Sequence, residues 1–156
     1  MKGNFAAFLK GFKYSFEGIV YCVKTQRNFR FHICAAVFVT AFSFFYELTK
    51  GEYVLLMLTF SSVLSAELIN TAVEAAVDLC SPKKNRLAKI AKDAAAGGVL
   101  VTAAFAVIVG VLLFGDIDVI KEIVLYYRSH IFALAGLICS FALAWWFVFG
   151  IGNSEK

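Results

Sequence analysis

The amino-acid sequence predicts an all-α membrane protein. Of its 156 residues, 61% are hydrophobic and 17% are charged, and the chain contains seventeen Phe and a single Pro. A soluble domain of this length would need more polar surface to cover itself. Because about 20 apolar residues cross the hydrocarbon layer, four segments are candidates for membrane-spanning helices. They lie at about residues 33–48, 53–79, 87–114 and 131–151.

The segment before the first span shows a helical period. Apolar side chains recur every three or four residues from Phe5 to Val23, and charged side chains occupy the opposite face. These charged residues are Lys10, Lys13, Glu17 and Lys24. The pattern predicts an amphipathic helix over residues 3–26 that lies in the membrane surface. On the pattern alone, a simple membrane anchor is the favoured interpretation.

Basic residues predict the orientation in the membrane. They are concentrated before the first span and between the second and third, whereas the opposite side holds only Lys50, Lys121 and Arg128. The positive-inside rule therefore places both termini in the cytoplasm and predicts a multi-pass protein. The net charge of +4 follows from this topology and requires no nucleic-acid partner.

The last part of the chain predicts two further elements. GDIDVIKEIVLYYRSH, residues 115–130, has a weak amphipathic pattern that indicates a second surface-lying segment. The following span carries no charge, and its Trp145 and Trp146 are suited to a membrane interface. We therefore divide the chain into a domain at residues 1–114 and a region at 115–156 that holds the outer connection and an extra span.

The second span contains three acidic residues that lipid does not accommodate. Within SAELINTAVEAAVDLC, residues 65–80, a helix places Glu67, Glu74 and Asp78 within about 40° of one another. Asn70 lies about 60° to one side of Glu67. An ionised carboxylate in lipid costs several kcal/mol, so this polar stripe must face protein, water or a cation. The stripe is therefore a candidate functional site.

The third span begins with a matching set of charges. Lys92 and Asp93 lie near its start, and Lys92 is expected to pair with Glu74 or Asp78 across a contact between the two helices. The alternative interpretation is an ion-paired packing seam, since a run of Ala and Gly follows and permits close backbone approach. Two charges would suffice for such a seam, and the larger number present favours a functional site.

Carboxylates, an amide and a lysine at one membrane boundary suit phosphoryl transfer from a nucleotide. Carboxylates hold Mg²⁺, lysine neutralises phosphate oxygens, and a remaining carboxylate takes the proton of an attacking hydroxyl. At that depth the hydroxyl would belong to a lipid. The sequence has no GxxxxGK[ST] and no GxGxxG, which excludes the phosphate loops of soluble kinases.

A small proton-coupled membrane transporter is the main alternative from another class, since it too has a few spans and a membrane-embedded acid. A transporter needs its acid near the midplane of the bilayer. Here the charges lie towards one face of the membrane, and the fourth span contributes no charged group. The kinase interpretation is therefore favoured.

The run AELINTAVEAAVDL at residues 66–79, followed by LAKIAKDAAAGGVL at 87–100, closely resembles the integral-membrane diacylglycerol kinase and undecaprenol kinase family. The resemblance includes RNFRFH at residues 27–32 and covers about residues 5–114. It implies an ATP- and Mg²⁺-dependent lipid kinase in a bacterial plasma membrane. It also implies a homotrimer of three-span subunits, with active sites at subunit boundaries near the cytoplasmic surface.

The resemblance also implies roles for individual residues. Glu67 would be the catalytic base that deprotonates the lipid hydroxyl, and Glu74 would ligate the Mg²⁺ that bridges the ATP phosphates. Asn70 and Asp78 would orient these groups. The surface helix would then wall the site as well as anchor the chain. The expected nucleotide-binding residues are Tyr14, Gln26, Glu74, Lys83, Lys84, Asn85, Lys92 and Asp93.

Two features depart from the family pattern. Gln26 stands where members typically carry a glutamate that is the second carboxylate on the metal. An amide oxygen ligates Mg²⁺ but brings no charge, so weaker metal binding, or recruitment of another acid such as Glu17, is expected. The second departure is the fourth span at residues 131–151, which three-span members lack.

The expected substrate rests on the resemblance alone. Family members divide between diacylglycerol and the isoprenoid alcohol undecaprenol. The RNFRFH segment, with His32, and the AKDAAAGG run are more similar to the members that phosphorylate undecaprenol. We therefore expect undecaprenyl phosphate as the product, with diacylglycerol phosphorylation as the alternative. His32 by itself is interpreted as a residue of the membrane interface.

Overall fold

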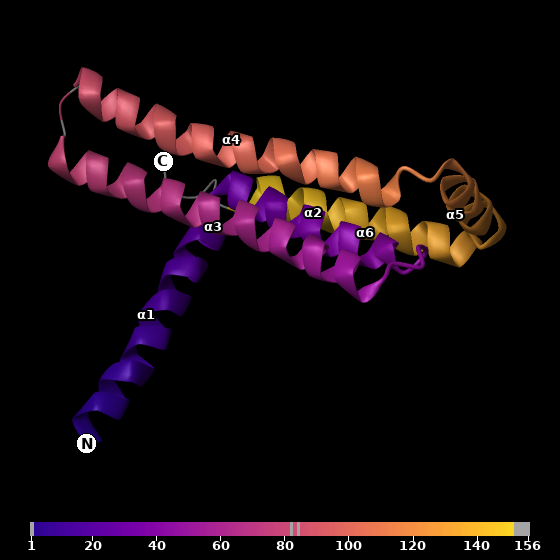
Figure 1. Ribbon diagram of the computed structural model, residues 1–156, viewed down its shortest axis with the longest axis horizontal. Helices are drawn as coiled ribbons and strands as arrows, with labels where there is room; N and C mark the ends of the chain where they lie inside the picture. The colour runs from indigo at the N-terminus through magenta and orange to yellow at the C-terminus, as the bar shows by residue number, and fades with distance from the viewer. Residues whose placement is uncertain (1, 82, 84, 152–156) are drawn as a thin grey trace.

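The computed structural model describes residues 2–81, 83 and 85–151, which form six α-helices and no strand (Figure 1). In chain order these are α1 Lys2–Thr25, α2 Arg27–Ser43, α3 Lys50–Cys80, α4 Arg86–Phe114, α5 Ile117–Ser129 and α6 Ile131–Gly150. The prediction of an all-α membrane protein is confirmed.

Three of the described helices are long and apolar enough to cross a membrane, namely α3, α4 and α6. α2 has 17 residues, a rise of about 25 Å, which is at the lower limit for a spanning helix. The expected span at residues 33–48 therefore differs from the helix, which includes the polar RNFRFH segment and ends at Ser43. That α2 crosses the membrane stays a prediction.

Polar side chains at the helix starts fix the turns between the long helices. α3 begins with a capping box, in which Glu52 N donates to Thr49 Oγ1 at 3.3 Å and Thr49 N donates to Glu52 Oε2 at 2.7 Å. Asn85 Oδ1 accepts a hydrogen bond of 2.8 Å from the first turn of α4, and Asp116 caps α5 in the same way. These caps satisfy backbone N–H groups that a helix start leaves without partners.

The turn between α2 and α3 is tied to the end of α4. Tyr46 Oη donates a hydrogen bond of 3.0 Å to the carbonyl of Phe114, and the two rings lie edge to face. Burial, and to a smaller extent the charge of Asp116, raises the pKa of Tyr46. The hydroxyl therefore keeps its proton and remains a donor, which holds the ends of three helices together.

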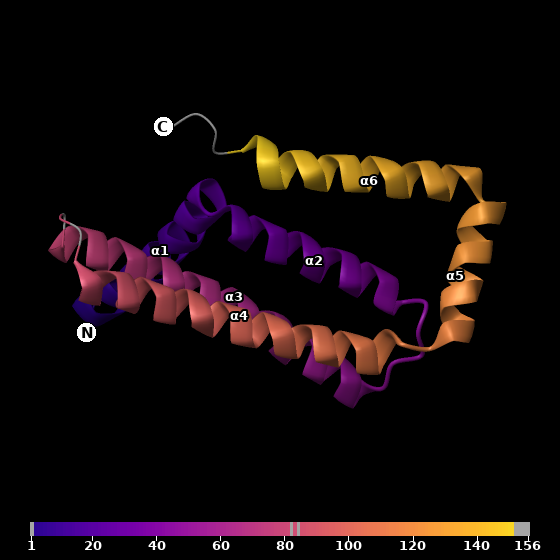
Figure 2. The same cartoon turned by 90° about the horizontal axis from the view of Figure 1, so that it is seen from above.

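The long helices lie side by side, and α2 separates α6 from the hairpin of α3 and α4 (Figure 2). α5 runs across one end of the bundle and joins α4 to α6. At the other end the α3–α4 hairpin extends beyond the ends of α2 and α6. This extension places the turn at residues 81–85 outside the packed part of the bundle.

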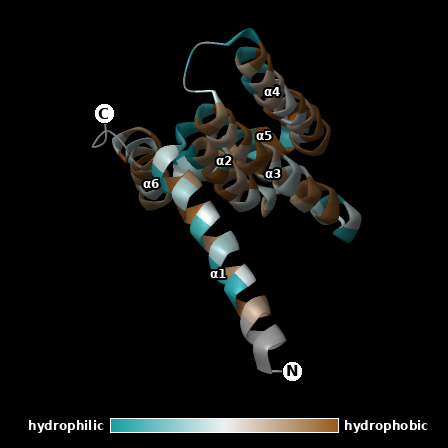
Figure 3. Ribbon diagram, turned by 90° about the vertical axis from the view of Figure 1, so that its left-hand side faces the viewer, coloured by the Kyte–Doolittle hydropathy of each residue, from teal (hydrophilic) through white to brown (hydrophobic). Residues whose placement is uncertain are grey.

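α1 leaves the bundle at a steep angle, and its contacts are with α2 and α3 (Figures 1 and 3). Hydrophilic and hydrophobic residues are mixed along it, whereas the other long helices are mainly hydrophobic. The helix predicted at residues 3–26 is thus present as Lys2–Thr25. Its location in the membrane surface stays a prediction.

The distribution of buried residues is that of a protein surrounded by lipid. Large apolar side chains are exposed along α3, α4 and α6, and α4 buries none of its residues within the described chain. Such surfaces are stable in a hydrocarbon layer and would aggregate in water. By contrast, several polar side chains are among the buried described residues, and these are Arg30, Ser43, Glu67 and Thr71. Two of these, Arg30 and Glu67, are charged residue types, which are rarely buried without a partner.

Candidate active site

The polar stripe of α3 (Glu67, Asn70, Glu74 and Asp78) runs from the packed part of the bundle to the α3–α4 turn. Glu67 is only 3% exposed, Glu74 is half-buried and Asp78 is exposed. Asn70 Nδ2 donates a hydrogen bond of 3.3 Å to Glu74 Oε1. The stripe therefore combines one buried carboxylate with one half-buried and one exposed carboxylate.

The buried carboxylate faces a histidine from another helix. Glu67 Oε1 lies 3.4 Å from His32 Nε2 of α2, and both side chains are largely buried. At this length and orientation the contact is not a hydrogen bond, and Glu67 Oε1 accepts none from the described residues. The sequence predicts that His32 is an interface residue, and the structure adds that it lies against the expected base.

The sequence contained little signal for this pairing. Counted from the ends of their helices, His32 lies close to the start of α2, whereas Glu67 lies several turns before the end of α3. The two meet because α3 extends beyond α2 at this end of the bundle. That offset between helices is a tertiary property. It is missed when the depth of a residue in the bundle is inferred from its distance along the sequence to the nearest loop.

His32 also lines an apolar groove. The groove lies between α2, α3 and α4 and has a volume of about 330 Å³. Its lining includes Phe31, His32, Leu56, Phe60, Val63 and Val107. A chain of methylene or isoprene units would be accommodated there with its polar end near His32, and hence near Glu67.

A second, polar groove lies where α3 and α4 approach the turn. It has a volume of about 650 Å³ and is lined by several charged side chains. Those from the expected site are Asp78, Lys83, Asn85, Lys92 and Asp93, and Arg86 and Lys89 add two further basic groups. Clustered basic groups at a membrane boundary suit the phosphates of a nucleotide. Lys84, also expected to contact the nucleotide, lies outside the described residues.

The ion pair expected between the second and third spans is present. Lys92 Nζ lies 2.5 Å from Asp78 Oδ1, so the partner of Lys92 is Asp78 rather than Glu74. Lys89 and Asp93 form a longer contact of 3.8 Å along α4. Because these groups are partly or largely exposed, such pairs contribute roughly 0–1 kcal/mol. They leave the charges available for a ligand.

A third groove lies between α1 and α3, and that α1 walls the site stays a prediction. Tyr14 lines a groove of about 460 Å³ between α1 and α3, together with Thr71 and Ala75. Gln26 lies at the junction of α1 and α2 and makes no capping hydrogen bond to the described residues. Within the described chain, neither Tyr14 nor Gln26 makes a side-chain hydrogen bond to the polar stripe. The structure thus brings α1 beside α3 without joining these two residues to the acids.

The residues present fit a magnesium ion held jointly by protein and nucleotide. Within the described ranges, no three His, Cys, Asp or Glu side chains come together as a complete metal site. Mg²⁺ at phosphate-transfer sites needs only one or two carboxylates in addition to substrate phosphates and water. Glu74 supplies one carboxylate, and the adjacent Asn70 Oδ1 is buried and accepts no hydrogen bond from the described residues. This pair of oxygens suits a hard cation.

The bundle exposes large apolar side chains along its long helices and gathers carboxylates and lysines near the α3–α4 turn. Sequence comparison identifies the class. The family profile described as prokaryotic diacylglycerol kinase matches residues 13–114. The chain belongs to this family, and it is a lipid kinase. Family membership removes the transporter alternative.

Three relatives illustrate the similarity. The undecaprenol kinase of Bacillus subtilis is 44% identical over 107 residues, which cover 69% of this chain and 87% of the relative. A diacylglycerol kinase of Synechocystis is 45% identical over 103 residues, or 65% of this chain and 59% of that protein. A diacylglycerol kinase of Haemophilus influenzae is 32% identical over 104 residues, or 65% and 88% of the two chains. The family profile ends with α4, so α5 and α6 lie outside it.

Proposed function

We propose that the protein transfers the γ-phosphoryl group of ATP to undecaprenol in a Mg²⁺-dependent reaction that forms undecaprenyl phosphate. The observation that carries this proposal is the buried Glu67, which lies against His32 beside an apolar groove. The similarity to the undecaprenol kinase of Bacillus subtilis, over most of that protein's length, supports the choice of lipid.

Glu67 is the proposed catalytic base. A carboxylate within the bundle, beside an apolar groove, is suited to contact the hydroxyl of a lipid whose chain lies in that groove. As the hydroxyl oxygen attacks the γ-phosphorus, Glu67 accepts the hydroxyl proton, and the bond from the γ-phosphorus to the bridging oxygen of ADP breaks. His32, 3.4 Å from the carboxylate, is suited to orient it towards the groove.

Glu74 and Asn70 are the proposed protein ligands of Mg²⁺, and Gln26 is a further candidate from the α1–α2 junction. When bound, the ion supplies charge neutralisation on the phosphate oxygens. Lys92 neutralises further phosphate charge and is oriented by Asp78, to which it is paired.

The remaining nucleotide contacts in this proposal come from the turn and the surface helix. Lys83, Asn85 and Asp93 line the polar groove, and Tyr14 lines the groove between α1 and α3. Lys83, Asn85 and Asp93 lie with Asp78 at the exposed end of the polar stripe, which a nucleotide in the cytoplasm would approach, whereas Tyr14 lies further along α3 beside Thr71. Lys84 is also a proposed nucleotide contact, on the basis of the sequence alone.

We further propose a homotrimer in a bacterial plasma membrane, with the active site and both termini in the cytoplasm. The concentration of basic residues at the α1–α2 and α3–α4 ends supports this orientation. α4 buries none of its residues within the described chain, which leaves its faces available to lipid or to a second copy. The lipid kinase domain would comprise residues 1–114.

Diacylglycerol is the second candidate acceptor, because relatives from Synechocystis and Haemophilus influenzae carry the name diacylglycerol kinase. The same residues would act on it, since both lipids present a hydroxyl near the membrane interface. The two candidates differ in the chain that must fit the apolar groove.

The test measures transfer of labelled γ-phosphate from ATP by the purified protein in lipid, with undecaprenol and diacylglycerol offered in parallel. Mg²⁺ is titrated, and the Glu67→Gln variant serves as the blank because it keeps the shape of the side chain and removes the base. Label in undecaprenol that is absent from the blank supports the proposal. Label in diacylglycerol alone would reassign the substrate, and equal label with Glu67→Gln would reassign the base.

A further inference from the structure

One buried arginine joins the ends of two helices that are far apart in the sequence. Arg30 of α2 is 3% exposed. Its Nε and Nη2 donate to the carbonyl of Val148 at 3.2 and 2.9 Å, and Nη2 also donates to Ile151 O at 2.6 Å. Its Nη1 donates to the carbonyls of Val23 and Lys24 at 2.9 and 3.2 Å. All three side-chain nitrogens are thus engaged.

The acceptors explain why a guanidinium is stable there. Val23 and Lys24 lie in the last turn of α1, while Val148 and Ile151 lie at the end of α6. Carbonyls in the last turn of a helix have no partner within the helix and form the negative end of its dipole. A planar guanidinium with donors in several directions is suited to cap two such ends together. We call this arrangement of Arg30 and its four carbonyl partners the Arg30 clamp.

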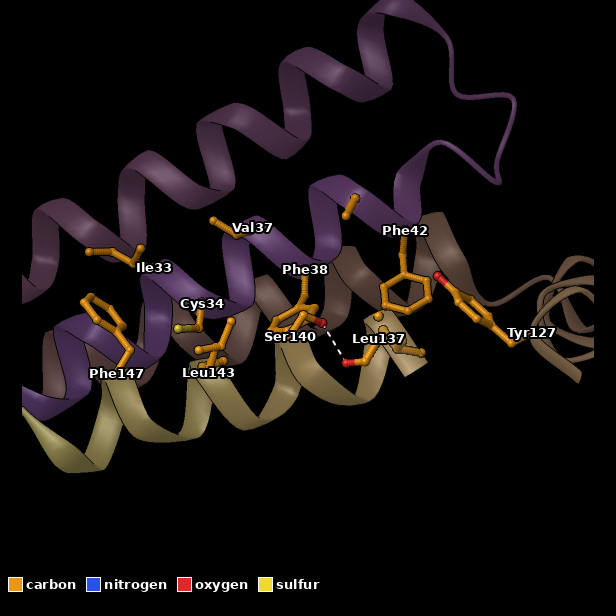
Figure 4. A pocket seen from close by; sticks show the side chains of 13 residues that line it. Ile33, Cys34, Val37, Phe38, Phe42, Tyr127, Leu137, Ser140, Leu143 and Phe147 are labelled. Atoms are coloured by element: carbon orange, nitrogen blue, oxygen red, sulfur yellow. Dashed lines mark hydrogen bonds between the residues drawn. The ribbon is translucent and has the colours of Figure 1, made fainter. Parts of the chain in front are cut away.

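α6 is also packed along the length of α2. Figure 4 shows side chains of both helices around an apolar cavity of about 580 Å³. Phe38 and Phe141 stack with their ring centroids 4.5 Å apart. At the end near the clamp, the guanidinium of Arg27 lies 5.7 Å from the ring centre of Phe149. The clamp therefore terminates an extended contact between α2 and a helix outside the family profile.

The clamp lies next to the proposed active site. Gln26 precedes α2 at the same junction, and α1 carries Tyr14 along α3. Arg30 and His32 are two residues apart, so they point to nearly opposite sides of α2. One side of the helix is thereby fixed to α6 and the other contacts Glu67.

We propose that α6 positions the nucleotide side of the active site through the Arg30 clamp, which makes Arg30 a positioning residue. The carbonyls of Val148 and Ile151 hold the guanidinium in the orientation in which it caps α1. Without them, Nε and Nη2 lose their partners, and the guanidinium is drawn away from α1 towards water. α1 would then lose its fixed direction relative to α3, and Tyr14 and Gln26 would lose their placement. The kinetic part of this proposal rests on the proposed function.

Two truncated proteins test the clamp. A stop codon after Phe147 removes both α6 acceptors, whereas a stop codon after Asn153 keeps both as uncharged backbone carbonyls and serves as the matched control. We expect the shorter protein to show a KM for ATP about tenfold higher, with a smaller change in KM for the lipid. We also expect backbone amides in the last turn of α1 to exchange hydrogen about tenfold faster. The control should match the full chain in both measurements.

Hydrogen exchange separates this proposal from the proposed function, because it needs no turnover. Faster exchange in α1 without any kinase activity in the full chain would support the clamp and refute the proposed function. Unchanged exchange and an unchanged KM for ATP in the shorter protein would overturn the clamp, even if the protein melted at a lower temperature.

Substitutions of Arg30 provide the second test and decide the question if the shorter protein does not fold. Arg30→Lys keeps the charge but loses the planar fork, so we expect an intermediate rise in KM for ATP. Arg30→Met removes every donor and should give the full effect. Equal KM values for ATP in the Met variant and the full chain would overturn the proposal.

Discussion

Replacing His32 by Leu removes the side chain that lies against the buried carboxylate of Glu67. Leu has a similar extent and fits a groove that is already apolar, so the main loss is electrostatic. His32 Nε2 is 3.4 Å from Glu67 Oε1, which has no hydrogen-bond donor among the described residues. Catalytic hydrogen bonds that are long without substrate often shorten when substrate binds, and removing one partner of such a buried bond costs about 1–3 kcal/mol. We therefore expect kcat/KM for the lipid alcohol to fall about 5- to 150-fold.

The assay measures initial rates of phosphate transfer at saturating ATP and Mg²⁺ while the lipid alcohol is varied. His32→Gln supplies an amide donor of similar reach and should recover much of the loss. His130→Leu is the matched control, since His130 is the other histidine of the chain and lies at the start of α6. The KM for ATP should be unchanged in all three variants, because the polar groove that suits the nucleotide lies nearer the α3–α4 turn.

A His32→Leu variant with kcat/KM within about twofold of the unmodified protein would refute the reasoning, because less than about 0.4 kcal/mol would then be lost. An equal fall in kcat/KM for the lipid alcohol and in kcat/KM for ATP would indicate a general distortion of the bundle instead of a local effect on Glu67. Circular dichroism and elution of the variant from a sizing column distinguish such distortion from a local change.

Three further predictions concern the metal and the nucleotide. Glu74→Ala should raise the Mg²⁺ concentration needed for half-maximal activity at least tenfold, and an unchanged Mg²⁺ titration would place the metal elsewhere. Gln26→Glu adds a carboxylate where the family pattern has one and should lower that concentration severalfold; a higher requirement would exclude Gln26 from the metal site. Lys92→Met should raise the KM for ATP about tenfold, because a positive charge is lost from the polar groove. A normal KM for ATP in that variant would show that the nucleotide binds away from this groove.

The polar stripe shows how far sequence reasoning extends at this site. Glu67, Glu74 and Asp78 share one face because a helix has 3.6 residues per turn, and the structure shows the gradient of burial along that face. The sequence left open whether Lys92 pairs with Glu74 or Asp78. The structure selects Asp78, although Glu74 and Lys92 are the pair equally distant from the turn along the chain. The pairing is therefore decided by the rotation and offset of the two helices and not by counting residues from the turn.

Arg30 and His32 show what sequence reasoning missed. Both lie in the polar RNFRFH segment, which directly precedes the first expected span, and from the sequence Arg30 is one of the basic residues concentrated before that span. In the structure this segment is helical, and both side chains are largely buried with partners from other helices. A polar segment is able to enter a helical bundle when its charged groups find such partners.

The sequence by itself determined the class of protein, the long helices, the amphipathic α1 and the acidic face of α3. These are local properties, since composition and the helical repeat act over a few neighbouring residues. Only the tertiary structure decided that His32 meets Glu67 and that Arg30 holds the end of α6, whose Val148 is 118 positions away along the chain. Such contacts depend on the rotation and axial offset of one helix against another, which arise from the packing of whole helix faces and are not encoded in any single segment.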